Sequence, residues 1–359
     1  MRKLATIQRV LSLNPIPDAD AIEVAQVLGW KVVVKKGEFN VNDLVVYCEI
    51  DSLMPERPEF EFLRNSKFRI RTVKLRGQVS QGICFPLSIL KQGDWDFGVR
   101  DMPIGEAAIA CIRNTKTDLF CGGIKLVEGA DVTEVLGITK YEAPIPAELA
   151  GNVKRALPSY FQVTDEDRIQ ILPHIPEQYG GQRFIATEKL DGSSCSFYWR
   201  NGEFGVCGRN WEYYESPTNS IWKFAKQNNI EEKLGDLGRN IALQGEIIGE
   251  GIQGNKYKLK GQTVRFFRAF DIDKYQYLPY DEFFELIENK LGLRCVPILD
   301  WEYVLPSTID EILAYAQGNS VLNPLIGREG VVFVRFDENY QGRLSFKAIS
   351  NKFLIDNKE

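Results

Sequence analysis

The sequence is poor in histidine, and this scarcity narrows its possible chemistry. Its 359 residues contain one histidine, His174, which stands between prolines in LPHIP. A single histidine argues against zinc sites built on histidines, Ser-His-Asp triads and histidine general bases. We therefore expect any acid–base or metal chemistry to use carboxylates, lysines, arginines or tyrosines.

Paired cysteines and long apolar runs are absent as well. The seven cysteines are scattered and form no CxxC pair. This pattern is typical of reduced thiols, so we expect a cytoplasmic or other reducing intracellular compartment. The longest apolar runs fall far short of a membrane span, and the N-terminal residues lack the apolar core of a signal peptide. We expect no membrane association, and a monomer is the default expectation.

The chain has no overall excess of cations, since its net charge is −5, but one segment departs from this balance. Residues 64–82 contain six cations and no acid, which makes them the strongest local field in the sequence. The six are Arg64, Lys67, Arg69, Arg71, Lys74 and Arg76.

Two interpretations of this basic segment stay open. A cationic stretch is often only the solvated face of a barrel. The alternative is binding to a nucleic-acid backbone, which makes affinity salt-dependent. Lys67, Arg69 and Arg71 share the parity of one predicted strand and would line one face of it. Lys74 and Arg76 would continue this candidate nucleic-acid-binding surface.

The pattern of strands and helices predicts two regions. Residues 1–85 consist mostly of short segments rich in Val and Ile, separated by Gly, Pro and Asp, which suggests a small barrel. A Pro-rich junction follows. Beyond it, strands alternate with helices, of which the sequence predicts three. They fall within residues 218–238, 279–292 and 307–318, the last with Ser307 as its N-cap.

A lysine stands between two apolar stretches that are expected to be strands, in FIATEKLDGSSCSFYW (residues 184–199). Leu190-Asp191-Gly192-Ser193 looks like the turn of a hairpin between them. Lys189 is either an exposed turn residue or a nucleophile. As a nucleophile it needs a pKa about three units below the usual value of about 10.4, which desolvation and nearby cations, including a metal, would provide.

A GxGxxG match at residues 249–254 has a weaker claim to function. A dinucleotide site needs a helix that opens at the last glycine, because the helix N-terminus holds the pyrophosphate. The following NKYKLKGQTVRFF does not have the pattern of that helix. The match therefore does not indicate a dinucleotide-binding domain.

Further charged residues follow Lys189 in a recognisable order. Their order is lysine, arginine, carboxylate, aromatic, carboxylate, lysine. The blocks are Lys189 in TEKLDGSS, Arg209 in CGRN, Glu246 in LQGEIIGEG, Phe267 in RFFRAFDI, Glu329 in GREGVVF and Lys347 in RLSFKAIS. In order and spacing they resemble the covalent nucleotidyltransferases. The match is closest to ATP-dependent RNA ligases, particularly the nick-sealing group with an OB domain ahead of the catalytic domain.

This resemblance implies an α+β fold. It implies an N-terminal OB-like β-barrel, followed by a nucleotidyltransferase (adenylation) domain of two antiparallel sheets with flanking helices. We place the nucleic-acid-binding OB-like domain at residues 1–140, a linker at 141–160 and the adenylation domain at 161–359.

The resemblance also implies a reaction that joins RNA ends. Lys189 would attack the α-phosphate of ATP, expel pyrophosphate and carry AMP as a phosphoramidate. AMP would pass to an RNA 5′-phosphate, and an RNA 3′-OH would then attack that activated phosphate. Glu246 and Glu329 would ligate Mg²⁺ or Mn²⁺, and Lys347 would hold the α-phosphate.

Other roles implied by the resemblance concern substrate binding. Arg209 would contact the ribose or the incoming phosphate. Phe267 would stack on adenine, and Glu188 would present its backbone to it. Ser194 stands where some relatives have an asparagine that helps hold the 5′-phosphate. Ser345 stands where relatives often have a second lysine, so one phosphate contact is either absent or supplied by Arg343.

Three alternatives remain. DNA ligases and mRNA capping guanylyltransferases share the first step, but they usually carry the OB domain after the catalytic domain. A nucleic-acid-binding protein that has lost catalysis is the third. The presence of Lys189, Glu246, Glu329 and Lys347 speaks against such a loss.

Overall fold

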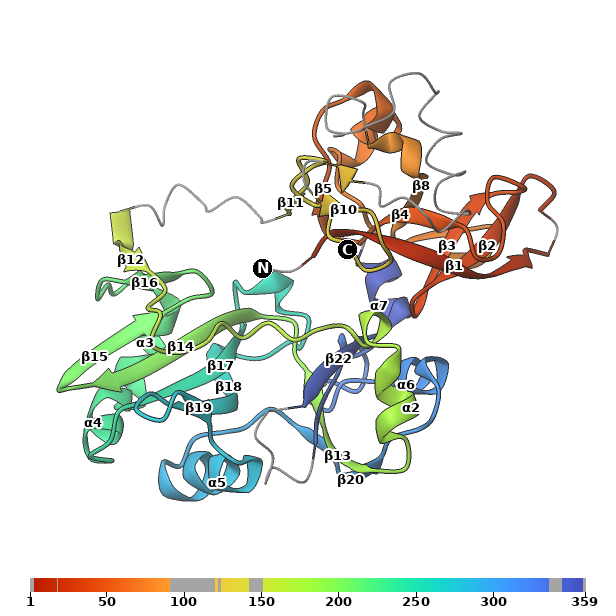
Figure 1. The fold of residues 1–359 in the computed structure, drawn as a ribbon. Coiled ribbons are helices and arrows are strands. Elements are labelled where there is room, and N and C mark those ends of the chain that lie inside the picture. The colour runs from red at the N-terminus through yellow and green to blue at the C-terminus, as the bar shows by residue number, and fades with distance from the viewer. Residues whose placement is uncertain are drawn as a thin grey trace. The chain divides into compact units, whose positions relative to one another are not determined.

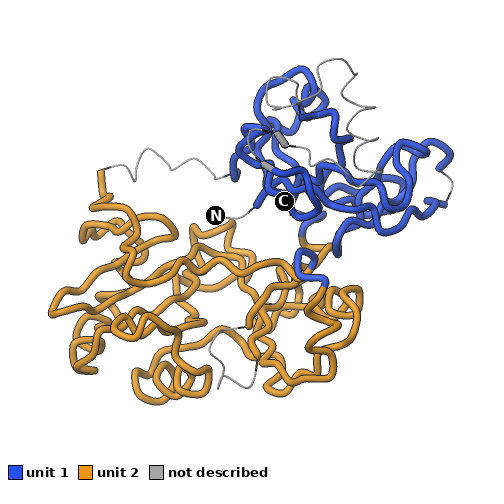
Figure 2. Tube along the Cα trace, viewed as in Figure 1, with its two compact units in different colours: residues 1–143, 170–173, 354–359 blue, residues 144–169, 174–353 orange. Residues whose placement is uncertain are grey.

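The computed structural model of the chain divides into two compact units (Figure 2). Unit 1 comprises residues 1–143, 170–173 and 354–359, and unit 2 comprises residues 144–169 and 174–353. The residues described are 3–17, 19–90, 120–121, 124–141, 151–335 and 344–357. Over these ranges, no helix is long and apolar enough to cross a membrane. The free cysteines found there are Cys48, Cys84, Cys195, Cys207 and Cys295, all buried.

Unit 1 is built on a five-stranded antiparallel sheet (Figure 1). In sheet order its strands are β3 (Trp30–Lys35), β2 (Ile22–Val27), β1 (Ala5–Pro15), β4 (Leu44–Cys48) and β8 (Ile83–Pro86). β1 pairs with β4 through its first half and with β2 through its second. The edge strand β3 is bonded beyond the sheet, since Val33 N donates to Ser80 Oγ and Gln81 N donates to Lys31 O, each at 2.9 Å. These bonds curl the sheet toward the small barrel that the sequence predicts.

The basic segment of unit 1 is not the strand expected from the sequence. It begins in a 3₁₀ helix, η1 (Pro58–Ser66), and the next two residues, Lys67 and Phe68, have φ of 53° and 58°. The left-handed backbone ends the alternation, so the prediction that Lys67, Arg69 and Arg71 line one strand face is wrong. Extended structure starts only at β6 (Val73–Leu75), which forms a hairpin with β7 (Gln78–Ser80).

The cations of this segment have different surroundings. Arg69 lies 2.7 Å from Asp51 Oδ1 and stacks over the Tyr141 ring at 4.2 Å. Lys67, Lys74 and Arg76 are exposed.

Minor elements complete the unit. They are β5 (Ser52–Leu53), which pairs with β11 (Thr139–Lys140), β9 (Phe120–Cys121), which pairs with β10 (Ile124–Lys125), and η2 (Leu87–Ile89).

Unit 2 contains two antiparallel sheets, in agreement with the fold that the family resemblance implies. The seven-stranded sheet has the order β12 (Val153–Ala156), β16 (Trp211–Tyr213), β15 (Glu203–Cys207), β14 (Ser193–Arg200), β17 (Ile241–Gly249), β18 (Gln262–Asp271) and β19 (Gln276–Tyr277). The four-stranded sheet has the order β20 (Ile298–Val304), β13 (Arg183–Lys189), β21 (Gly330–Arg335) and β22 (Ser345–Ile349). β12 falls within the segment interpreted as a linker, and it pairs with β16.

Alternation along the strands of the larger sheet separates a core face from a polar face. On β17, Ile241, Leu243 and Ile247 belong to the main core cluster, whereas Glu246 points to the other face. Helices cover the core face, and the cluster includes apolar residues from three of them. These three are α3 (Ser220–Gln227), α4 (Ile230–Gly235) and α5 (Tyr280–Phe284).

The predicted helices are present with changed boundaries. The segment 218–238 forms two helices instead of one, because Asn229 between them has φ of 51°. α5 continues as a π-helix, η7 (Glu285–Lys290), up to the predicted end near Gly292. In α6 (Ile309–Ala316) the N-cap is Thr308 rather than Ser307. The other helical elements are α2 (His174–Tyr179), α7 (Asn351–Asp356), η5 (Ile169–Ile171) and η6 (Gln253–Asn255).

Candidate active site

Lys189 lies where the chain crosses from one sheet of unit 2 to the other. β13 and β14 belong to different sheets, so the hairpin expected around Lys189 is wrong. Each strand pairs elsewhere, β13 with β20 and β21, and β14 with β15 and β17. Residues 190–192 form the crossing. Side chains from both sheets can therefore meet at Lys189.

The crossing passes close to β17, and glycine at position 192 allows this approach. A Cβ at Gly192 would lie 2.4 Å from Ile247 O and 2.9 Å from Glu246 Cγ, distances that real Cβ atoms do not adopt against backbone. Beyond the crossing, Ser194 is the ladder partner of Glu246. Ser194 Oγ donates a hydrogen bond to Glu246 Oε2 at 3.3 Å.

Lys189 forms an ion pair with Glu329. Its Nζ lies 2.5 Å from Glu329 Oε1, with the lysine side chain 27% exposed and the glutamate 11%. β13 and β21 pair so that Lys189 lies opposite Gly330. A Cβ at Gly330 would lie 2.2 Å from Ala348 O, so glycine lets β21 approach β22 and holds Glu329 beside the lysine.

Two carboxylates keep Lys189 protonated. Burial alone would lower its pKa, but the charges of Glu329 and Glu246 outweigh burial and raise the pKa above its ordinary value. The lowered pKa expected for a lysine nucleophile is therefore wrong for this arrangement. The cause is that nearby opposite charges favour the ammonium form. The amine becomes nucleophilic when these carboxylate charges are offset.

The same two carboxylates suit a hard divalent cation. Burial raises the pKa of Glu246 to about 8, and Glu329 Oε2 is buried without a hydrogen-bond partner among the residues that the structure describes. Proteins often hold Mg²⁺ with one or two carboxylates together with substrate phosphates. Within the described ranges, no three His, Cys, Asp or Glu side chains form a metal-binding group. The donor set therefore fits a metal that also has ligands from a substrate.

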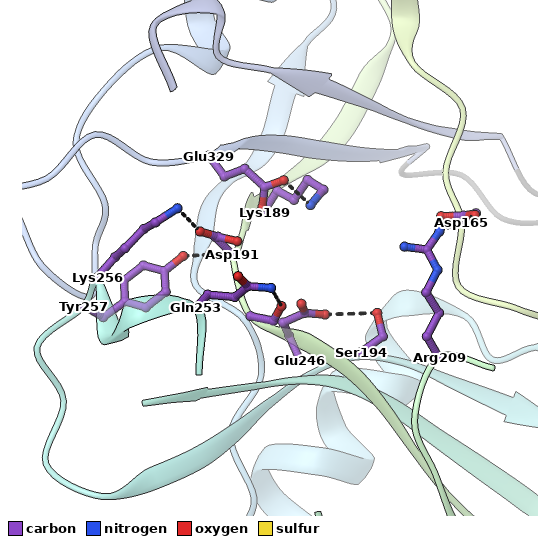
Figure 3. Close-up of polar contacts among 11 residues, drawn as sticks. Asp165, Lys189, Asp191, Ser194, Arg209, Glu246, Gln253, Lys256, Tyr257 and Glu329 are labelled. Atoms are coloured by element: carbon purple, nitrogen blue, oxygen red, sulfur yellow. Dashed lines mark hydrogen bonds and ion pairs between the residues drawn. The ribbon is translucent and has the colours of Figure 1, made fainter. Parts of the chain in front are cut away.

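A loop after β17 makes three polar contacts with the crossing, residues 190–192 (Figure 3). Tyr257 OH accepts a hydrogen bond from Asp191 N at 2.7 Å, and Gln253 Nε2 donates to Gly192 O at 3.4 Å. Lys256 forms an ion pair with Asp191. The roles of Gln253 and Lys256 cannot be recognised from the sequence, because a polar loop gives no sign of what it contacts.

Lys347 lies on β22, in the same sheet as Lys189 and near Glu329. Burial raises the pKa of Glu329, and the charges of Lys189 and Lys347 partly offset this rise. Two positions before Lys347, Ser345 Oγ donates to Glu166 Oε2 at 2.7 Å. Arg343, the other source considered for a second phosphate contact, lies outside the described residues.

Arg209 lies just after β15, as the sequence predicts, and it pairs with an acid. Its Nη2 lies 2.8 Å from each carboxylate oxygen of Asp165. The side chains are 46% and 51% exposed, and exposed pairs of this kind contribute little to stability. The pair with Asp165 therefore holds Arg209 only weakly. Asp165 could not be recognised from the sequence, because it precedes all the blocks that resemble a known family.

Glu188 precedes Lys189 in the sequence, and Phe267 packs near Leu190, the residue that follows the lysine. Glu188 Oε2 accepts from Val321 N, and the Glu188 N–H donates to Pro297 O, both at 2.8 Å. The other oxygen, Oε1, is buried and has no hydrogen-bond partner in the described part of the chain. Phe267 is the extra residue where the β17–β18 register shifts, and it packs partly buried in a cluster with Leu190.

Comparison with known proteins agrees with this fold and site. Residues 4–87 match an OB-fold domain family, and residues 182–349 match the RNA ligase family. No curated protein sequence matches the chain.

Solved structures of Naegleria gruberi RNA ligase resemble the whole chain. A variant with AMP and Mn is 41% identical, with TM-score 0.82, and the match covers 100% of this chain and 99% of that one. The structure with PPi is 42% identical, with TM-score 0.81 and the same coverage. A variant with ATP and Mn is 40% identical, with TM-score 0.82 and full coverage of both chains.

The fold and the site together define the class of protein. It has an OB-fold domain followed by a two-sheet catalytic domain in which Lys189 contacts Glu329 and lies within the field of Glu246. The chain belongs to the RNA ligase family. The family resemblance and the α+β fold class inferred from the sequence are therefore confirmed.

Proposed function

We propose that this protein is an ATP-dependent RNA ligase that joins 3′-OH and 5′-phosphate RNA ends at nicks in duplex RNA. One observation carries the proposal. Lys189 Nζ lies 2.5 Å from Glu329 Oε1, within the field of Glu246 from the other sheet. An amine beside two carboxylates suits covalent nucleotidyl transfer, which depends mainly on positioning and charge neutralisation.

Lys189 Nζ attacks the α-phosphorus of ATP, the P–N bond forms, and pyrophosphate leaves. The RNA 5′-phosphate then takes AMP from the lysine, and the 3′-OH of the adjoining end displaces AMP. Lys347 lies near Glu329 and holds the α-phosphate during these transfers. Arg209 exchanges Asp165 for the ribose or for the incoming phosphate, and Ser194 helps to hold the 5′-phosphate.

Adenine binds beside the crossing. Glu188 offers its buried Oε1, which has no hydrogen-bond partner among the described residues, to the exocyclic amino group, since its backbone N–H already donates to Pro297 O. Phe267 provides an aromatic face next to Leu190. Base–aromatic stacking of this kind contributes roughly 1–3 kcal/mol per base.

Glu246 and Glu329 would hold Mg²⁺ or Mn²⁺. When bound, the ion stabilises negative charge on the reacting phosphate and offsets the two carboxylates that keep Lys189 protonated. The Naegleria relative was solved with ATP, with AMP and with Mn.

Unit 1 serves the RNA. We assign residues 1–140 as the OB-like nucleic-acid-binding domain and residues 161–359 as the adenylation domain. Within the segment 141–160, which the sequence suggests as a linker, β12 already belongs to the sheet of the adenylation domain. The cations on unit 1 contact the phosphate backbone. The exposed Lys67, Lys74 and Arg76 make the main contacts, and Arg71 and Arg69, which is paired with Asp51, contribute less. A-form duplexes are recognised by shape and 2′-OH contacts, so little base specificity is expected. We further propose a monomer in a reducing intracellular compartment, which suits the free buried cysteines of the described ranges.

A labelling assay tests the proposal. The protein is mixed with α-labelled ATP or GTP and a divalent metal, and label that survives denaturation is measured. ATP label that is lost in Lys189→Ala and on chelation supports a ligase. GTP label indicates a capping enzyme, and absence of label indicates a binding protein. Sealing of matched RNA and DNA nicks then decides between an RNA ligase and a DNA ligase.

A further inference from the structure

Unit 2 contains a pocket whose lining is separate from the candidate active-site residues. Its volume is about 400 Å³. The residues assigned above to catalysis and ATP binding do not line it. The lining combines charged side chains with an apolar wall. It comprises Arg265, Phe284, Glu288, Arg294, Cys295, Val296, Pro297, Ile298 and Leu322.

Arg265 connects this pocket to the catalytic residues. On β18 it is the direct ladder partner of Glu246 on β17. Residues directly opposite each other in an antiparallel pair project from the same face, with Cβ atoms roughly 5 Å apart. The pocket is therefore connected to Glu246 through neighbouring strands of one sheet.

Arg265 lacks a partner for one of its donors. Its Nε is buried and makes no hydrogen bond within the part of the chain that the structure describes. A buried donor of a charged group that stays unpaired is costly, and such groups in folded proteins usually have a partner. An unpaired guanidinium N–H in a pocket indicates an anionic ligand with acceptor oxygens.

The acid of the pocket is already engaged. Glu288 Oε2 lies 3.0 Å from Arg294 Nη1, and Glu288 Oε1 accepts a hydrogen bond from Cys295 N at 2.7 Å. Two guanidinium groups and one carboxylate leave the pocket with an excess of one positive charge. The π-helix η7 supplies Glu288, and π-helical turns are frequent at functional sites.

The apolar wall suits a base or a ribose. Phe284 lies at the pocket with its ring centroid 5.1 Å from that of Trp301, edge to face. Trp301 is 41% exposed. Val296, Pro297 and Ile298 continue the wall along the start of β20. A free phosphate would leave this wall unused, whereas a nucleotide would cover it.

We propose that this pocket binds one nucleotide of the RNA substrate, with its phosphodiester at Arg265 and Arg294 and its base or ribose against the apolar wall at Phe284. The inference deepens the proposed function and rests on it, because it takes RNA as the substrate. One excess positive charge matches the single negative charge of a phosphodiester. Because β18 pairs with β17, Arg265 lies on the strand next to the one that carries Glu246.

The test compares RNA binding with lysine adenylylation in the full-length protein. Binding of a labelled nicked RNA duplex is measured by fluorescence anisotropy over a series of salt concentrations. Arg265→Gln and Arg294→Gln are compared with Arg183→Gln, which removes an equally charged residue that is 60% exposed and paired with Glu302 on the four-stranded sheet. Arg265→Lys keeps the charge and changes the geometry of the donors.

We expect Arg265→Gln to bind RNA roughly 10-fold more weakly, with a salt slope shallower by about 0.7–0.9. Arg294→Gln should show a smaller loss, Arg265→Lys an intermediate one and Arg183→Gln none. Lysyl-AMP formation should be unchanged in Arg183→Gln and should fall less than RNA binding in the Arg265 and Arg294 variants. Arg294 is 72% exposed, so its variant should fold even if Arg265→Gln does not.

Two results would overturn the pocket assignment. In one, Arg265 and Arg294 variants bind RNA like Arg183→Gln. In the other, ATP affinity falls while RNA binding is unchanged, so that the pocket serves ATP. Failure of the proposed function is distinguishable, because the unaltered protein would then form no lysyl-AMP or would seal no RNA nick.

Discussion

Lys189 Nζ and Glu329 Oε1 lie 2.5 Å apart, although the two residues are 140 positions apart in the sequence. The pairing of β13 with β21 produces this contact, because it places Lys189 opposite Gly330. The ammonium is therefore built into the sheet together with its counter-charge. An ion pair of this kind stabilises the resting state and opposes nucleophilic attack, since only the neutral amine can attack phosphorus.

We predict that lysyl-AMP formation accelerates with pH. The pKa of Lys189 is raised, so below that pKa the neutral fraction grows about 10-fold per pH unit. The pKa of Glu246 is raised to about 8, and its ionisation favours metal binding over the same range. The single-turnover rate at saturating ATP, with the metal below saturation, should rise steadily between about pH 6 and 9.

Glu329→Gln provides the matching test. It removes the carboxylate that most strongly raises the lysine pKa. The rise of the lysyl-AMP formation rate should therefore shift to lower pH. The maximal rate should fall roughly 10–100-fold, because metal binding is weaker. Glu302→Gln, at an exposed pair with Arg183, should leave the profile unchanged. A rate that is independent of pH in the unaltered protein would contradict the prediction.

Tyr257→Phe tests the loop that fastens the crossing. Tyr257 is 5% exposed and its OH accepts from Asp191 N at 2.7 Å. Without this acceptor the Asp191 N–H is unpaired, so we expect about 1–2 kcal/mol less stability. Lysyl-AMP formation should fall roughly 10-fold, because misplaced reacting groups slow the chemistry. Tyr275→Phe, at an exposed tyrosine, should change neither denaturant unfolding nor labelling.

The hairpin of unit 1 makes a separate prediction. Lys74 and Arg76 are exposed on and beside β6, where each can contact one phosphate. The double alanine variant should bind nicked RNA more weakly, with a salt slope shallower by about 1.4–1.8 for two lost contacts. Lysyl-AMP formation should be unaffected. A salt slope equal to that of the unaltered protein would show that this hairpin is only a solvated surface.

The charged residues of the site could be found from the sequence, but their arrangement could not. Glu246 and Lys347 stand in apolar strands, where burying a charge without a partner is costly. The other residues are identified by the order of the blocks from Lys189 to Lys347, which resembles a known family. Residues 184–199 still suggested a hairpin, since two apolar strands around an Asp-Gly turn usually pair. β13 and β14 join different sheets because they pair with strands that are distant in the sequence, such as β21 and β17. No local sequence pattern encodes this choice of partner.

Local backbone geometry caused the other differences. Alternation predicted a strand through Lys67, but the positive φ of Lys67 and Phe68 is adopted by residues with no intrinsic preference for it, so tertiary contacts decide. Asn229 similarly interrupts a continuous helical pattern. The small barrel is predictable because short strands rich in Val and Ile recur over residues 1–85 and do not depend on any one turn. The two-sheet domain is implied only by the resemblance to nucleotidyltransferases.

The edge of the seven-stranded sheet depends on a buried acid. Glu212 on β16 has a side chain that is 1% exposed. It accepts from Lys154 Nζ at 2.8 Å, Arg155 Nε at 2.5 Å and Tyr198 OH at 3.0 Å. Burial alone would raise the pKa of Glu212, but hydrogen bonds from these three groups outweigh burial and hold the pKa below its ordinary value of 4.5. The acid thus joins β12 to the rest of the sheet.

Glu212→Gln should destabilise the protein by about 2 kcal/mol, less than the roughly 3–5 kcal/mol of a fully buried pair, because both cations are partly exposed. A lowered folded-state pKa gives stability that is fully present above the unfolded value and is lost as pH falls through the folded value. The difference in the free energy of unfolding between the unaltered protein and Glu212→Gln should therefore be constant near neutrality. It should shrink below about pH 4.5. Denaturant unfolding at several pH values measures it, with Glu203→Gln at an exposed position of the same sheet as control. A difference that grows toward acid pH would mean that Glu212 is protonated in the folded protein, and the three donors would then need another acceptor.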